Sequence, residues 1–454
     1  MQLVAYGAQD IYLTGNPQIT FFKVVYRRHT NFATESIEQT FTGSVDFGRK
    51  ISATIDRNGD LLYKMYLEVD LDVGADGRTK AGVGTHPLGI DNLYANRLGH
   101  AMIREVSVEI GGQCMDTHYG EWLELWSQLS MGGEEIAKHR TLIDGDLLDT
   151  ARNNRDANGI ITSDQHRKLY IPLQFWFNRN PGLALPLIAL QYHEVKINVF
   201  LETAEASGFA NDSGAQISQI CLFCDYVFLD TDERRRFAQV SHEYLIEQLQ
   251  FNNIVSIDGS EACANIELRF NHPCKDMVWT VQPQIQDVTS GRRLHPFDWS
   301  RQSAAGTGTT TTQQQQGSGT GGALDNMLKA KLQLNGHDRF RERQGTYFRC
   351  VQPFQHYTGG FLQSNPSANA VWADNGFFYV YSFALKPEEH QPSGTCNFSR
   401  IDNATLQTVI SVTKDADGNL VDGLDLVPRF VRVYATNYNV LRIMSGMGGL
   451  AYSN

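Results

Sequence analysis

Two cysteines with the spacing of half a zinc site are the first residues whose types suggest chemistry. Cys221 and Cys224 form a C-x-x-C pair, and the sequence contains no second pair to complete a tetrahedral site. The residues around them are rich in β-branched and aromatic types, which indicates a strand. On a strand these two side chains point to opposite faces, so we expect two structural cysteines and no zinc site.

Other short patterns match catalytic or cofactor motifs only in part. Gly317, Gly319 and Gly322 fit a dinucleotide fingerprint, but they lie in low-complexity sequence with no Rossmann strand before them. The run from Asp415 begins like a calcium loop, yet its twelfth position is Leu426. No H-E-x-x-H or G-x-S-x-G motif is present. We therefore expect no catalytic residue, no cofactor and no metal site, although acids from distant strands could still meet and act on sugars.

A basic and aromatic cluster near the N-terminus is a candidate contact site for assembly. Lys23, Arg27 and Arg28 stand among aromatic residues, within a segment, 1–36, that shows no clear strand alternation. In a chain of net charge −11, this cluster suits an acidic partner or a membrane-side component. The alternative is that the segment packs below its own sandwich and serves folding.

The overall charge argues against direct nucleic-acid binding. The chain has 39 Lys and Arg residues against 50 Asp and Glu residues. A general nucleic-acid binder needs a basic surface for the phosphate backbone, and this balance does not provide one.

Three N-x-[S/T] sequons, at Asn211, Asn397 and Asn403, are the candidate glycosylation sites. The N-terminus has no basic region followed by a long apolar run, so we expect no signal peptide. The seven scattered cysteines form no disulfide framework, which agrees with folding in a reducing compartment. In that setting chance matches explain the sequons.

Alternation with a period of two residues dominates the rest of the chain. Every second residue from Leu61 to Val73 is apolar, with charged residues at 64, 68, 70 and 72 on the other face. One helix is expected where Tyr119, Trp122, Trp126 and Leu129 recur at helical spacing, and we interpret it as sealing one end of a core. Turns and long loops separate the strands, which favours antiparallel sandwiches over a parallel sheet. The clearest expected strands span residues 61–73, 106–110, 168–177, 194–202, 217–229, 244–251, 264–270, 277–281, 328–334, 377–384, 406–412 and 430–435.

The stretch 215–253 joins two units of similar design. After its first strand, Asp230 or Thr231 can cap a short helix with acids in the first turn and arginines later, which complements the helix dipole. The segment ending in Ile110 resembles the one ending in Leu334, an offset of 224 residues. The segment before Thr231 resembles the one before Thr436, an offset of 205 residues. Because both echoes occur in the same order, we predict a duplicated unit: an arm at 1–36, a first sandwich at 37–238 and a second at 239–454.

The start of the chain carries a specific resemblance. Leu3–Arg28, LVAYGAQDIYLTGNPQITFFKVVYRR, closely resembles the N-terminal segment of major capsid proteins of nucleocytoplasmic large DNA viruses, especially those of algae and protists. The similarity continues through Thr30–Phe41 and Arg57–Leu61 and returns at Asn437–Asn454. It implies an all-β fold of two tandem eight-stranded antiparallel jelly-roll β-sandwiches with short helices and long loops. It also implies a non-enzymatic subunit that trimerises into pseudo-hexagonal capsomers, which form the icosahedral shell of a large double-stranded DNA virus.

The same resemblance implies partners and a location. The partners would be two further copies in a homotrimer, neighbouring capsomers, minor capsid and penton proteins, and components of an internal viral membrane. The protein would reside in the virion shell and be assembled in the host cytoplasm. We expect the low-complexity segment 301–322 to be a loop on the outer face, and residues 1–32 to lie at the inner base. The alternative function is a sugar-binding or glycan-processing double β-sandwich.

Overall fold

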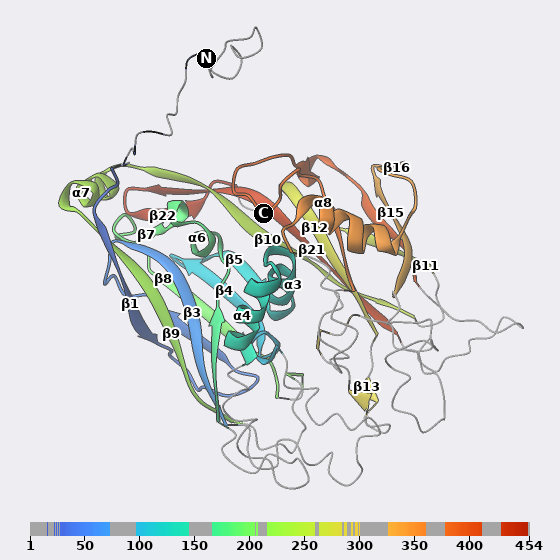
Figure 1. The fold of residues 1–454 in the computed structure, drawn as a ribbon, viewed down its shortest axis with the longest axis horizontal. Helices are drawn as coiled ribbons and strands as arrows, with labels where there is room; N and C mark the ends of the chain where they lie inside the picture. Colours follow the sequence, from blue (N-terminus) through green and yellow to red (C-terminus); the bar gives the residue numbers. More distant parts are fainter. Residues whose placement is uncertain are drawn as a thin grey trace, which may run out of the picture.

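The computed structural model contains two β-sandwiches built from consecutive halves of the chain (Figure 1). The structure describes residues 28–72, 97–144, 166–204, 206–207, 216–258, 263–283, 286–287, 292–293, 296–297, 299, 326–359, 377–410 and 428–452, and residues 16, 22, 24 and 26.

The first sandwich packs two antiparallel sheets around one apolar core. Its inward residues alternate along each strand, as in Met65, Leu67, Val69 and Leu71, all of which are buried. A β-bulge between Leu62 and Met65 breaks the alternation predicted from residue 61 onward. One sheet has the order β1 (Phe32–Thr40), β9 (Gln216–Leu229), β3 (Leu61–Asp72), β6 (His166–Pro172), with short β7 (Leu185–Pro186) beside β3; the other has the order β2 (Lys50–Thr54), β8 (Val195–Leu201), β4 (Ile103–Ile110), β5 (Gln113–Tyr119).

The second sandwich repeats this arrangement with its own core. One sheet has the order β10 (His242–Ile257), β21 (Arg429–Met444), β12 (Pro273–Pro283), β18 (Phe378–Ser382), with short β19 (Cys396–Asn397) and β22 (Met447–Leu450) attached. The other has the order β11 (Cys263–Leu268), β20 (Ala404–Ile410), β15 (Met327–Leu334), β16 (His337–Asp338), with β17 (Arg343–Gln344) beside β15. Short β13 (Gln286–Asp287) and β14 (Arg292–Arg293) form a separate pair.

The two sandwiches share one topology. When the eight main strands of each are numbered in chain order, both have sheets 1-8-3-6 and 2-7-4-5. This is the double Greek-key order of a jelly roll, so the predicted tandem jelly rolls are confirmed. The division of the chain at residues 36 and 238 stays a prediction, and β1 already begins at Phe32, inside the segment interpreted as an arm. Strand β1 was not predicted from the sequence, because only Ile37 and Gln39 face inward and its other residues are exposed.

The offset of 224 residues marks equivalent positions. Ile110 and Leu334 end β4 and β15, the fourth strand of each sandwich, and each is followed by two residues with positive φ. The offset of 205 also falls on equivalent strands, β9 and β21, but their ends differ. Strand β9 stops at Leu229, whereas β21 continues through Thr436 to Met444, so the predicted strand 430–435 was too short. Its second half is rich in buried polar residues, which hide the alternation.

The helices lie in the connections between strands. As predicted, Asp230 caps α7 (Thr231–Gln239), its Oδ1 accepting from the Thr231 N–H at 2.8 Å, and a helix follows Tyr119. The strand predicted at 168–177 was wrong at its end, because three consecutive buried aromatic residues from Phe175 leave the sheet and enter a helical turn. The helices are α2 (Leu98–Ala101), α3 (Gly120–Ser130), α4 (Gly133–Asp144), α6 (Trp176–Arg179), α7, α8 (Gln352–His356) and the turns η1 (Pro181–Leu183), η2 (Tyr347–Val351) and η3 (Phe398–Arg400).

Two glycines occupy equivalent positions in the two sandwiches. Gly120 begins α3 and Gly345 lies just before η2, each in the connection from the fifth to the sixth strand. A Cβ on Gly120 would lie 2.2 Å from the carbonyl oxygen of Ile103, the first residue of β4. A Cβ on Gly345 would lie 2.3 Å from the carbonyl oxygen of Met327, the first residue of β15. Close backbone approach thus fixes where each connection leaves its sandwich.

We expect Gly120→Ala and Gly345→Ala each to lower the free energy of unfolding by about 3 kcal/mol, because backbone atoms must move to admit the methyl group. Gly132→Ala is the matched control, since a Cβ there meets nothing within 4 Å. Urea unfolding of the three variants measures the effect. Equal stability of Gly120→Ala and Gly132→Ala would contradict the close approach.

Candidate assembly interface

Helix α3 belongs to the first sandwich by sequence but lies on the outer face of the second. Its residues Trp122, Leu125, Trp126 and Leu129 recur at helical spacing and form one buried cluster with residues of the second half. The predicted helix is therefore confirmed, whereas its interpretation as a seal on one core is wrong. The other members of the cluster are Ala101, Phe297, Trp299, Tyr357 and Phe377, together with Val278 of β12, Phe378 and Val380 of β18, and Tyr434 of β21.

One carboxylate of α3 anchors this contact. Oε1 of Glu121 accepts hydrogen bonds from the Thr280 hydroxyl at 2.9 Å and the Trp299 indole N–H at 2.8 Å. Oε2 accepts from the Tyr434 hydroxyl at 2.7 Å and lies 3.6 Å from Nε of Arg432. Burial and the nearby carboxylate raise the pKa of Tyr434, so its hydroxyl stays protonated and donates. All four partners come from the second half of the chain.

A buried ionic cluster lies beside α3. Nζ of Lys275 on β12 is 2.7 Å from Oε2 of Glu247 on β10, and Arg179 of α6 reaches the same oxygen at 3.1 Å. The Arg179 guanidinium also covers the Trp126 ring at 4.6 Å. Burial would raise the pKa of Glu247, but Lys275 and Arg179 outweigh it and hold that pKa below its usual value. Burial lowers the pKa of Lys275 against the pull of Glu247 and Asp276. The paired charges join the two sandwiches without an isolated ion.

The C-terminal hairpin provides a second junction, in which a segment of the second half packs against the first sandwich. Leu441 and Ile443 of β21, from the second half, are buried in the core of the first sandwich. In the turn that follows, the Gly446 carbonyl accepts from the Tyr192 N–H at 3.0 Å. A Cβ on Gly446 would lie 2.6 Å from the Tyr192 ring, so the hairpin fits closely. Each sandwich therefore inserts a segment into the other.

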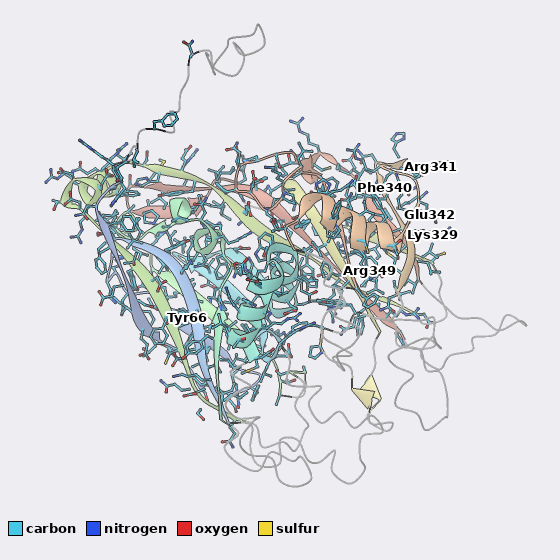
Figure 2. All side chains as sticks on the ribbon, in the orientation of Figure 1. Tyr66, Lys329, Phe340, Arg341, Glu342 and Arg349 are labelled. Atoms are coloured by element: carbon cyan, nitrogen blue, oxygen red, sulfur yellow. The ribbon has the colours of Figure 1, made fainter. Side chains whose placement is uncertain are left out.

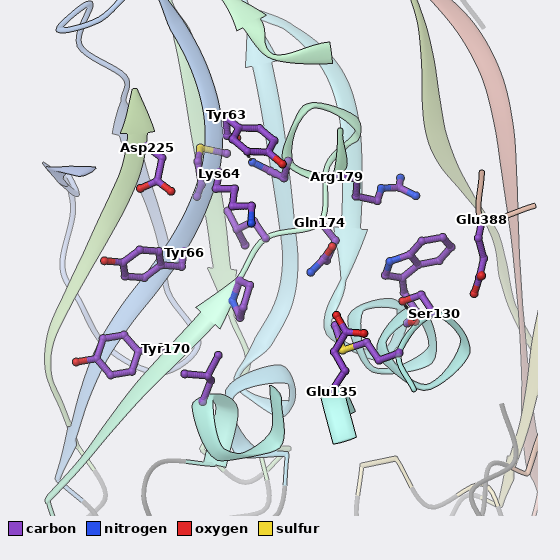
Figure 3. Close-up of a pocket in the computed structure, with 17 residues that line it drawn as sticks. Tyr63, Lys64, Tyr66, Ser130, Glu135, Tyr170, Gln174, Arg179, Asp225 and Glu388 are labelled. Carbon is purple, nitrogen blue, oxygen red and sulfur yellow. Dashed lines mark hydrogen bonds between the residues drawn. The ribbon is translucent and has the colours of Figure 1, made fainter. Parts of the chain in front are cut away.

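The corresponding outer face of the first sandwich carries an open groove of about 710 Å³ (Figure 3). Its floor includes Tyr66 of β3, which stacks on Phe223 of β9 with ring centroids 5.2 Å apart, and Tyr170 of β6, 6.1 Å from Tyr66. The acids that line the groove, Asp225, Glu135 and Glu388, lie at separate edges in Figure 3. They do not form the facing pair that the glycan-processing alternative requires.

The comparisons with known proteins cover both sandwiches. A family described as "Major capsid protein N-terminus" matches residues 20–230, and one described as "Large eukaryotic DNA virus major capsid protein" matches residues 233–449. The chain belongs to the major capsid proteins of large eukaryotic DNA viruses. The two matches meet at the end of β9 and the start of α7, where the first sandwich passes to the second.

Individual relatives in this capsid family match along the whole chain. The chain is 47% identical to the major capsid protein of Pyramimonas orientalis virus and 42% identical to that of Paramecium bursaria Chlorella virus 1, covering 100% of this chain and 99% of each relative. It is 38% identical, with a TM-score of 0.73, to PBCV-1 VP54, whose crystal structure was fitted into a reconstruction of the virophage Sputnik. That comparison covers 96% of this chain and 100% of VP54. The resemblance predicted from Leu3–Arg28 is confirmed.

The candidate site residues of this capsid protein are only partly within the described ranges. Lys23, Arg27 and Asn211 lie outside them, and Arg28 is exposed. Asn397 is exposed, and its side-chain oxygen accepts from the Ser399 N–H at 3.1 Å, which caps η3. Asn403 is also exposed. Whether any of them serves assembly or carries a glycan stays a prediction.

The two cysteines of the C-x-x-C pair lie on opposite faces of β9, as predicted. Cys224 faces the first core and Cys221 the outer side of β9, and both are free thiols. Among the described residues no group of three or more His, Cys, Asp or Glu could hold a metal ion. Within the same ranges, no helix has the length and apolar character to cross a membrane. Glu121 and Lys275 were missed, because single polar residues carry no spacing signal.

We expect Glu121→Ala to lower the free energy of unfolding by about 3 kcal/mol, because it leaves buried donors of the second half without an acceptor. Glu134→Ala, at an exposed position of α4, is the matched control and should change stability by less than about 0.5 kcal/mol. Thermal and urea unfolding measure both. Two indistinguishable variants would remove Glu121 as the anchor.

Proposed function

We propose that this chain is the structural subunit of a virion shell: three copies form a capsomer with pseudo-hexagonal outline, and capsomers form an icosahedral capsid around a double-stranded DNA genome. The observation that carries this proposal is similarity along the whole chain to proteins named major capsid protein, at up to 47% identity among those compared. The protein resides in the capsid shell and acts through its contacts, not as an enzyme. Further partners would be minor capsid proteins, penton proteins and components of an internal membrane.

The duplicated fold supports a trimer. Each chain presents two sandwiches of the same topology, so three chains present six similar units. Six similar units around a three-fold axis have a nearly hexagonal outline. Such a trimer can therefore pack on a hexagonal lattice.

Strand register supports an orientation for this subunit. At one end of the first sandwich, the arm end, Phe32 pairs with Leu229 and α7 follows. At the other end, the loop end, Asp72 pairs with both Gln216 and His166, and long connections begin there. Figure 1 shows α7 and β13 at opposite ends of the molecule. We place the arm end on the inside of the shell and the loop end outside. The segment 301–322, which lies outside the described residues, would then be an outer loop.

Purified protein should form particles of about three times the 50.9 kDa chain mass in light scattering at micromolar concentration. Electron microscopy of the same sample should show trimers or hexagonal arrays. A monomer across this concentration range, in protein that melts cooperatively, would contradict the proposed function.

The arm is proposed to serve shell assembly more than folding. Arg28 and two arginines of α7, at 235 and 236, are exposed near the arm end and suit an acidic partner, whereas Arg234 pairs with Asp60 at 2.8 Å. Deleting residues 1–20, or changing Lys23, Arg27 and Arg28 to Gln, should leave folded trimers that form shells poorly. Melting curves, light scattering and microscopy of shells measure this. Variants that lose the cooperative melt would show that the arm is structural.

A further inference from the structure

The second sandwich carries a counterpart of α3. Residues 345–356, which contain η2 and α8, form the counterpart helix, in the same connection from the fifth to the sixth strand. At the start of this helix, Gly345 lies close to the first residue of the fourth strand, as Gly120 does at the start of α3. The two glycines are 225 residues apart, close to the offset of 224 between the fourth strands.

The counterpart helix has an apolar stripe, and the described part of this chain leaves two of its four residues exposed. Adding 225 to the numbers of the four buried α3 residues gives four positions on the counterpart helix. Of these, Phe354 is 87% exposed and Val351 is 39% exposed. Leu385, beside them, is 71% exposed, and its carbonyl is 3.0 Å from Nδ1 of His356. The corresponding residues are Tyr347, Cys350, Val351 and Phe354.

This exposure does not come from a loosely held helix. On its other side, the Phe348 ring packs on Trp279 at 5.2 Å in the second core. Oε1 of Gln352 accepts from the Ser382 N–H of β18 at 3.0 Å. Val351 and Phe354 are therefore held in place and exposed, whereas Tyr347 packs against the core of its own sandwich.

The surface that would receive such a stripe also has a counterpart. In the second sandwich, α3 covers the outer row formed by Tyr434, Val278 and Val380 on the eighth, third and sixth strands. The first sandwich has an outward row on its own eighth, third and sixth strands, formed by Phe223, Tyr66 and Pro172. Tyr66 and Pro172 line the open groove, and Phe223 stacks on Tyr66.

Within one chain the exposed end of the stripe does not pack in the groove, since Phe354 is 87% exposed. Figure 2 shows Tyr66 and Arg349, a residue of the counterpart helix, toward opposite sides of the molecule. A contact between these two surfaces therefore needs two copies of the chain.

We propose that the groove over β9, β3 and β6 receives the counterpart helix of a second copy, with Phe354 against Tyr66 and its neighbours, as α3 covers the second sandwich within one chain. This inference rests on the proposed trimer and goes beyond it by assigning the two surfaces. The contact is heterologous, so it continues from copy to copy until the ring closes. The contact of α3 within each chain and the contact of the counterpart helix with the next chain would be similar. A ring of three copies would then contain six similar contacts.

Polar residues on the two surfaces differ from those of the α3 contact. The offset of 225 places Thr346 where α3 has Glu121, so the counterpart helix lacks the anchoring carboxylate. The receiving face also differs in residue type: Phe223 and Cys221 lie on the outer side of β9, whereas Tyr434 and Arg432 lie on the outer side of β21. The anchoring carboxylate of α3 is thus absent from the counterpart helix. Aromatic residues of the groove would receive Phe354, and charged residues such as Lys64 and Asp225 also line the groove.

The stripe is tested by Phe354→Asp, with the wild type and Val240→Asp measured in parallel. Val240 is also an exposed apolar residue, 54% accessible, and lies after α7, away from both surfaces. We expect Phe354→Asp to raise the concentration at which trimers dissociate by about 100-fold, because a charge replaces a central aromatic contact. Its melting as a monomer should be cooperative, and Val240→Asp should remain trimeric.

A pair of cysteines tests the geometry directly and does not depend on the folding of Phe354→Asp. Tyr66→Cys and Phe354→Cys together should give disulfide-linked dimers and trimers on a non-reducing gel, whereas each single variant should not. A wild-type trimer that persists in Phe354→Asp and gives no cross-link in the double variant would overturn the assigned surfaces and leave the trimer intact. A wild type that is monomeric would overturn the proposed function itself.

Discussion

The burial of helix α3 against the outer face of a neighbouring sheet is the contact on which the rest of this structure depends. The outer face of a sandwich normally meets water, but here Val278, Val380 and Tyr434 make it apolar, and it has to be covered. Helix α3 covers it, and Glu121 supplies one carboxylate to three side-chain donors that would otherwise be buried without an acceptor. Because acceptor and donors come from different sandwiches, the contact fixes their orientation as well as their proximity.

The proposed assembly repeats this local contact between copies of the chain. The two sandwiches share strand order and the glycine that starts the helical connection, but they differ in what covers their outer faces. One face is covered by a helix of the same chain and retains a charged anchor. The other is open, and the helix that matches it carries Phe354 toward solvent. A contact inside the subunit with a buried carboxylate, and a separate proposed contact between subunits centred on Phe354, would let capsomers form from subunits that are already folded.

The sequence predicts the parts of this fold that depend on local patterns. Alternation locates most strands, Asp230 marks the cap of α7, and the segments ending in Ile110 and Leu334 reveal the duplication. The length of β21 is hidden because Thr436, Asn437 and Asn439 are polar yet buried in the second half of the strand. The apolar stripe of α3 can be recognised in the sequence. The sequence does not show whether the stripe packs on the core of its own sandwich or on the outer face of the neighbouring one. The groove cannot be predicted from local patterns, since its floor combines three strands that lie far apart in the chain.

A density map of the purified capsomer tests the central claim most directly. The account predicts that residues 345–356 of each copy lie across β9, β3 and β6 of the next copy, with Phe354 over Tyr66, in a ring of three. A capsomer in which this groove is open to solvent, or in which another segment fills it, would contradict the account.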